Sequence, residues 1–135
     1  MKKYFAFALV GLICGCGHAA EFTKQIWGSS TKALEEARSD ASVKSFNCDY
    51  EECFDAVLGI AKKNKLTIFI NEKKRSRLVL LGIPGSVDRT EVGVFFLTFS
   101  ARETKIEVTS LSLQAKEKAA EIIFKHLGEQ FSLVQ

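Results

Sequence analysis

Histidine is scarce in this chain, which has two histidines among its 135 residues. His18 lies near the N-terminus, and His126 lies near the end of an expected helix, where a cation suits the helix dipole. Neither stands beside cysteines or carboxylates at the spacing of a metal site. The sequence also lacks a nucleophile elbow, a glycine-rich phosphate loop and a paired-carboxylate motif. It therefore predicts no metal site, no cofactor and no enzyme activity.

The sequence also lacks a large excess of positive or negative charge. The chain has 19 Lys and Arg residues against 16 Asp and Glu residues, a formal net charge of +3. Lys2 and Lys3 belong to an export signal, described next, and about +1 remains once they are removed. This balance gives no reason to expect a nucleic-acid partner. No internal repeat and no low-complexity tract is present.

The apolar run near the N-terminus is too short to cross a bilayer. Tyr4–Ile13 is about ten residues long, and a membrane-spanning helix needs about twenty. Two lysines precede the run and small residues follow it, which is typical of a cleaved export signal. Ile13-Cys14-Gly15-Cys16 resembles the lipobox of bacterial lipoproteins. The resemblance implies that residues 1–15 are removed and that Cys16 carries lipid.

The lipobox has consequences for location. Several acyl chains, such as palmitate, attach a protein lastingly, because each buried methylene contributes about 0.8 kcal/mol. Gly17 stands where an aspartate retains familiar Gram-negative lipoproteins on the inner membrane. By resemblance, this favours a periplasm-facing position on the outer membrane. The alternative is an ordinary secretory signal cleaved after Ala19, which would release an unlipidated protein.

The four cysteines divide between the signal and the mature chain. Cys14 leaves with the signal and Cys16 carries lipid, so Cys48 and Cys53 remain. In an oxidising compartment they are a candidate disulfide, and a loop this short contributes about 2 kcal/mol in the chain-entropy model. The alternative is that both thiols are small buried apolar groups.

The composition separates a tether from a folded domain. Residues 16–42 are mostly small and polar, and we expect a lipidated cysteine and a tether there. Ser30–Ala41 predicts a short surface helix whose weak apolar stripe includes Leu34. This helix is expected to lean on the domain or on a partner. The domain itself is expected over residues 43–135.

The apolar spacing predicts the elements of the domain. Asp49 is expected to cap a helix that continues to Lys62, with Asn64 as its left-handed terminator. Pro84-Gly85 predicts a turn with a left-handed third residue, and Gly128 is expected to end the last helix. The expected strands and last helix are 43–48, 66–71, 78–83, 91–100, 105–111 and 113–127.

The order strand, helix, four strands, helix predicts an α+β domain. It has two layers, with an antiparallel sheet of about five strands and two helices on one face. The strand 92–99 is apolar on both of its faces, which indicates that both faces are covered. We predict that the face away from the helices is a docking face, formed by Phe69, Val79, Leu81, Phe95, Leu97 and Phe99. Three covers remain open: the tether around Trp27, a second copy of the chain, or a ligand or partner.

A basic cluster is the other candidate surface. The end of the first helix and the following hairpin turn are expected at the same end of the domain, where they would face anionic lipid or acidic cell-wall groups. The alternative is a solvated turn and a helix end. The cluster consists of Lys62, Lys63, Lys65, Lys73, Lys74, Arg75 and Arg77.

The domain resembles the small helix-grip-like domains of envelope lipoproteins, including those of the barrel-assembly accessory lipoprotein. It is more similar to an uncharacterised family of small bacterial lipoproteins. The residues that carry this resemblance lie within about 43–127 and are Phe54, Ala56, Ala61, Leu66 and Ile68. The resemblance implies the fold, and it transfers no activity and no catalytic residue.

Together these features predict a lipid-anchored envelope lipoprotein with a non-catalytic interaction module that supports assembly or maintenance of the outer membrane. Its partners would be the membrane and an envelope protein or a second copy. The alternative function is a carrier of lipid or of a small apolar ligand on the apolar sheet face.

Overall fold

The computed structural model describes residues 31–87 and 89–135. The predicted export signal (residues 1–15), Cys16, His18 and Trp27 lie outside them. Residues 33–135 form one folded unit, which begins at Ala33 rather than at the expected Val43. Within the described residues, no helix has the length and apolar character needed to cross a membrane.

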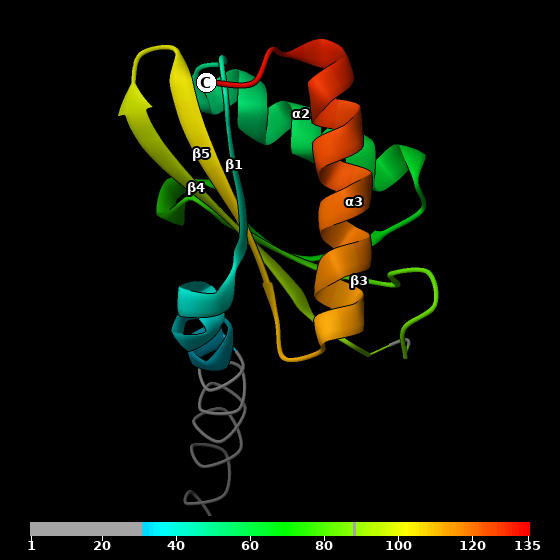
Figure 1. The fold of residues 1–135 in the computed structure, drawn as a ribbon. Helices are drawn as coiled ribbons and strands as arrows, with labels where there is room; N and C mark the ends of the chain where they lie inside the picture. The colour runs from blue at the N-terminus through cyan, green and yellow to red at the C-terminus, as the bar shows by residue number, and fades with distance from the viewer. Residues whose placement is uncertain (1–30, 88) are drawn as a thin grey trace, which may run out of the picture. The chain divides into compact units, whose positions relative to one another are not determined.

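The fold is α+β, as predicted, with five antiparallel strands in the spatial order β1-β5-β4-β3-β2. Both long helices pack against one face of this sheet and share a single core cluster (Figure 1). The predicted chain order is confirmed. The elements are β1 (Ser42–Phe46), α2 (Tyr50–Lys63), β2 (Thr67–Glu72), β3 (Arg77–Leu81), β4 (Val92–Ser100), β5 (Glu103–Ser110) and α3 (Leu113–Gln130).

Helix α2 starts as its sequence predicts. The Asp49 side chain accepts a hydrogen bond from the backbone N–H of Glu52 at 2.8 Å, which satisfies an otherwise unpaired donor of the first turn. The prediction for its end is wrong by one residue, since Asn64 has a φ of −93° and Lys65 has a φ of +58°. Asn64 instead donates from its side chain to the carbonyl of Ile60 at 2.8 Å.

Cys48 and Cys53 form a disulfide in the structure, with their Cα atoms 5.8 Å apart. Cys48 follows β1, and Cys53 lies in the first turn of α2. Both side chains are also buried in the main core. The bond therefore fixes the start of α2 against the adjacent sheet strand.

Helix α3 is longer than predicted. Ser112 caps it by accepting from the Ala115 N–H, but the helix runs through Gly128 to Gln130. Phe131 follows the last turn, donates its N–H to the Leu127 carbonyl at 2.8 Å and packs against the main core. This apolar contact favours two more helical residues over termination at the glycine.

The C-terminal segment then returns to the sheet. Asn47 donates its backbone N–H to the Ser132 carbonyl at 2.9 Å, and Val134 donates to the Ser45 carbonyl at 3.0 Å. These two bonds form an antiparallel bridge between Phe46 and Leu133. The end of β1 is thus paired on both sides.

Candidate docking surfaces

The predicted docking face is not one exposed surface. Val79 is 2% exposed and Phe95 is 5% exposed, whereas Phe99 is 61% exposed. Leu81 and Leu97 are half-buried, and Phe69 lies in β2, on the far side of β3 from β4. Leu97 and Phe99 lie on the part of β4 that extends beyond its pairing with β3. The prediction of a single docking face formed by all six residues is therefore wrong.

The chain itself covers the centre of this face. Residues 33–36 are helical and continue into a 3₁₀ turn, η1 (Ala37–Asp40), and we call residues 33–40 the cover segment. Leu34 is 2% exposed and packs against Val79 and Phe95 in a second, smaller core cluster, with Ile70 at its border. The sequence assigned this segment to the tether, but its one large apolar side chain completes the sheet packing.

A glycine in β4 lets the cover segment come close to the sheet. A Cβ atom at Gly93 would lie 2.8 Å from Thr109 Oγ1, 3.0 Å from a ring carbon of Phe95 and 3.4 Å from the Cβ of Leu34. Glycine within a strand often marks such a close approach. The hydroxyl of Thr109 is buried here and has no hydrogen-bond partner among the described residues.

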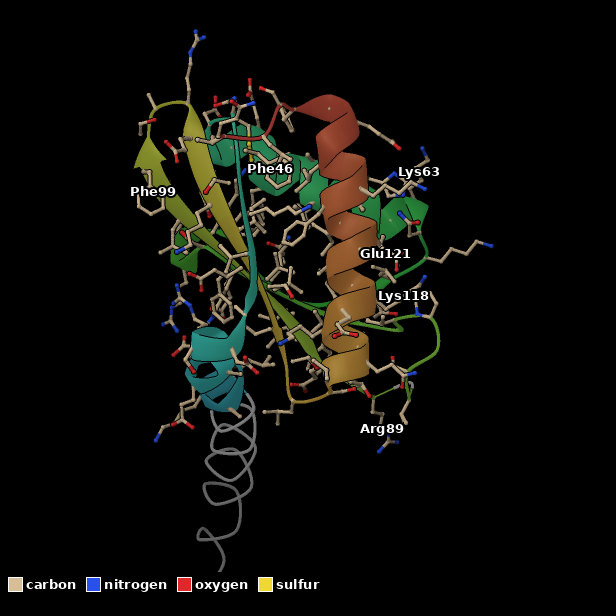
Figure 2. All side chains as sticks on the ribbon, in the orientation of Figure 1. Phe46, Lys63, Arg89, Phe99, Lys118 and Glu121 are labelled. Atoms are coloured by element: carbon tan, nitrogen blue, oxygen red, sulfur yellow. A yellow bond between two sulfur atoms is a disulfide. The ribbon has the colours of Figure 1, made fainter. Side chains whose placement is uncertain are left out.

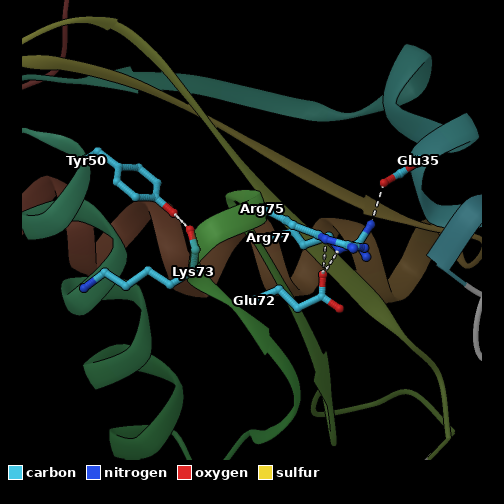
Figure 3. A network of polar contacts seen from close by, with 6 residues as sticks. All are labelled: Glu35, Tyr50, Glu72, Lys73, Arg75 and Arg77. Atoms are coloured by element: carbon cyan, nitrogen blue, oxygen red, sulfur yellow. Dashed lines mark hydrogen bonds and ion pairs between the residues drawn. The ribbon is translucent and has the colours of Figure 1, made fainter.

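Two ion pairs join the cover segment to β5 and to β3. Arg38 donates from Nε to a Glu107 carboxylate oxygen of β5 at 2.8 Å, and its guanidinium carbon lies 4.7 Å from the Phe95 ring centroid. Arg77 of β3 donates from Nη1 to Glu35 at 2.6 Å (Figure 3). The charged residues belong to the cover segment, β3 and β5. The ion pairs therefore determine where the cover segment lies on the sheet and also hold it there.

Arg77 also binds Glu72, the last residue of β2, through Nε at 2.6 Å. This hydrogen bond lowers the pKa of Glu72, against a smaller opposing effect of burial and with help from the charges of Arg77 and Arg75. The same pairing raises the pKa of Arg77. One guanidinium thus joins the first hairpin to the cover segment (Figure 3).

The lowered pKa of Glu72 predicts an acid-dependent contribution to stability. Its folded pKa lies below the ordinary 4.5, so the contribution is present above pH 4.5 and is lost as pH falls through the folded value. The carboxylate is 34% exposed, so we expect less than about 1 kcal/mol. Urea unfolding should show Glu72→Gln to be less stable than the unsubstituted chain at pH 7, with the difference shrinking as the pH falls below 4.5. A difference that is constant with pH would contradict this explanation.

The basic cluster is divided in the structure, which contradicts its placement at one end. Lys73 forms ion pairs with Glu51 and Asp55, near the start of α2, and these hydrogen bonds, Glu51 first, raise its pKa. Lys62 and Lys63 lie at the other end of α2 (Figure 2), about 16 Å further along the helix axis. The hairpin turn returns to the start of α2 because β2 runs back along the helix.

The remaining members of the cluster do not restore the patch. Tyr50 donates its hydroxyl to the Lys73 carbonyl, which fixes the hairpin turn beside the first turn of α2 (Figure 3). Arg77 is only 12% exposed in its side chain and is engaged by Glu35 and Glu72. The exposed members of the cluster form two groups, Lys62, Lys63 and Lys65 at the end of α2 and Lys74 and Arg75 on the turn.

A shallow groove of about 590 Å³, which the sequence did not predict, lies between β1 and α3. Val43, Ala120 and Phe124 form its apolar surface, and the polar part of its lining consists of Ser42, Lys44, Glu117, Glu121 and Lys125. The ammonium group of Lys44 lies 5.5 Å from the Phe124 ring centroid. No local sequence pattern predicts this groove, because the groove forms only where the fold places the edge strand β1 beside α3.

The described residues contain no group of three or more histidine, cysteine, aspartate or glutamate side chains placed to hold a metal ion. His126 is within 3.4 Å of Glu129, one turn further along α3. No protein-family model matches the chain, and no curated protein sequence matches it.

Proposed function

We propose that this chain is a lipid-anchored lipoprotein of the bacterial envelope, facing the periplasm, whose α+β domain is a non-catalytic interaction module. The observation that carries the proposal is the lipobox-like Ile13-Cys14-Gly15-Cys16 after a short apolar run. A disulfide between Cys48 and Cys53 agrees with an oxidising compartment. The outer membrane is the proposed site, with a role in its assembly or maintenance.

The proposed protein-binding surface is the exposed end of the β4–β5 hairpin. Phe99 is 61% exposed, and the Lys105 ammonium group lies 5.8 Å from its ring centroid. Leu97 extends this surface toward the sheet centre. An exposed aromatic ring beside a cation suits an envelope protein that offers apolar and acidic side chains.

A carrier function has less support. A carrier that used the second sheet face would need its apolar centre to be open to a ligand. Leu34, with the ion pairs of Arg38 and Glu35, occupies that centre instead. We therefore propose the interaction module rather than the carrier.

Mass spectrometry of the protein purified from membranes tests the anchor. We expect a mature N-terminus at Cys16 that carries acyl chains, and complete loss of acylation in Cys16→Ala. An unlipidated mature chain that begins at Ala20 would show the secretory alternative and would contradict the proposal.

A photo-crosslinking phenylalanine analogue at position 99 then tests the module, with the same analogue at Val43, 44% exposed on β1, as a matched control. A discrete protein adduct is expected at position 99 alone.

A further inference from the structure

Three aliphatic side chains stand out on the surface of the domain. Leu111 is 77% exposed, Val87 is 75% exposed and Leu113 is 63% exposed. They are the three most exposed large apolar residues in the part of the chain that the structure describes. We call these three residues the apolar tip.

Hydrogen bonds join the two loops that carry the residues of the apolar tip. Ser110 donates its hydroxyl to the Glu91 carbonyl at 2.8 Å, and Ser112 donates its N–H back to the Ser110 hydroxyl at 3.2 Å. The loop before Glu91 is closed by a bond from the Thr90 N–H to the Val87 carbonyl at 2.9 Å. The turn between β5 and α3 therefore lies beside the loop that connects β3 to β4.

The folded unit begins at this same end. Leu34 packs close to Gly93, the second residue of β4, and the first residue of β4, Val92, pairs with Ser110. Figure 1 shows residues 33–36, the β5–α3 turn and the β3–β4 loop at one end of the domain. The β4–β5 hairpin, with Phe99, lies at the opposite end of β4. The start of the folded unit thus lies at the same end of the domain as the apolar tip.

The β3–β4 loop carries one arginine, Arg89, and two acidic residues, Asp88 and Glu91, so its charge is mixed, and aliphatic exposure is what suits the apolar tip to a phospholipid surface. The first turn of α3 carries no acidic side chain, and Arg89 is exposed in the same loop as Val87 (Figure 2). Aliphatic side chains bind at the boundary of headgroups and acyl chains, and an arginine beside them can bind lipid phosphate. A soluble partner would have to reach a surface that an anchored chain already holds near the bilayer.

We propose that the apolar tip lies in the headgroup region of the membrane to which the chain is anchored. The lipid then holds the chain at the membrane, and Leu111, Leu113 and Val87 set the orientation of the domain. The β4–β5 hairpin consequently points away from the bilayer and is available to a partner. This inference rests on the lipid anchor proposed above.

Spin labelling of the lipidated protein tests the orientation. The variants Leu111→Cys, Leu113→Cys and, as control, Phe99→Cys are labelled after reconstitution into phosphatidylethanolamine and phosphatidylglycerol vesicles. Because Cys48 and Cys53 are bonded, the introduced thiol is the one labelled. We expect positions 111 and 113 to be more accessible to oxygen than to a water-soluble nickel chelate, with the reverse at position 99. Labels at 111 and 113 as water-accessible as the label at 99, on protein that stays bound to vesicles, would overturn the inference.

Further measurements distinguish membrane contact from the other possible outcomes. Protein that fails to bind vesicles at all would overturn the anchor and the orientation together. Burial at 111 and 113 that disappears when the protein is diluted in lipid would assign the apolar tip to a second copy and overturn membrane contact. Leu111→Asp with Leu113→Asp should reduce the oxygen accessibility of a label at Val87→Cys to the value measured at position 99. Leu133→Asp, at a side chain 49% exposed elsewhere on the surface, should leave it unchanged.

Discussion

Replacing Leu34 by aspartate is expected to detach the cover segment from the sheet. Leu34 is 2% exposed and provides the apolar contact to Val79 and Phe95. Loss of a buried leucine side chain costs about 2–5 kcal/mol, and an unpaired carboxylate in that position would cost more. The segment avoids burying the charge by leaving the sheet. The variant therefore loses at most the free energy that the whole cover segment contributes to stability, which is about 3 kcal/mol.

Urea unfolding and limited proteolysis together measure this effect. We expect a lower urea midpoint and trypsin cleavage after Arg38, whose guanidinium is held by Glu107 and by the Phe95 ring in the intact protein. Leu34→Met keeps the side-chain volume and should retain both properties within about 1.5 kcal/mol. If the aspartate variant matched the methionine variant in both measurements, the packing role of Leu34 would be wrong.

Gly93→Ala is expected to weaken the same contact from the sheet side. The added methyl group would lie 2.8 Å from Thr109 Oγ1 and 3.0 Å from Phe95, closer than side-chain atoms normally approach. Overpacking of this kind costs about 1–3 kcal/mol, because the neighbouring side chains and the cover segment must shift. We expect the urea midpoint to fall and the cleavage after Arg38 to increase.

A double-mutant cycle identifies the clash. Thr109→Ala removes the hydroxyl oxygen that lies closest to the added methyl group. The alanine at position 93 should therefore cost less in the Thr109→Ala background than alone, by about 1 kcal/mol. Additive effects would show that the cost arises elsewhere, as a general change in the backbone of β4.

Local sequence rules predicted the elements of the fold well, because the relevant interactions are short-range. Asp49 and Glu52 define the start of α2 within one turn. Pro84 and Gly85 define a turn in which Gly85 has a φ of +82°, as expected. The alternation of apolar residues identified two sheet faces and the need to cover both. The end of α3 was missed because Phe131, beyond the expected stop at Gly128, is held by packing that the sequence does not reveal.

The site was predicted less completely, because it depends on long-range partners. The sequence shows that Arg77 and Lys73 are positive, but it does not show that Glu35 and Asp55 neutralise them. The cover segment has only a weak apolar stripe, so its sequence pattern did not predict that its single leucine would be buried. A glycine within an otherwise apolar strand, at position 93, is the one local sign that another backbone element comes close.

The bridge between Phe46 and Leu133 has a consequence for self-association. Edge strands offer unpaired backbone groups to other chains, and anchored molecules confined to a membrane plane meet one another often. Residues 132–134 occupy the outer side of β1 near its end, while a register shift between Ile68 and Ile70 interrupts the opposite edge strand, β2. Both borders of the sheet are thereby poor templates for strand addition. Under the proposed lipid anchor, crowding at the bilayer would increase specific encounters without promoting polymerisation through the sheet.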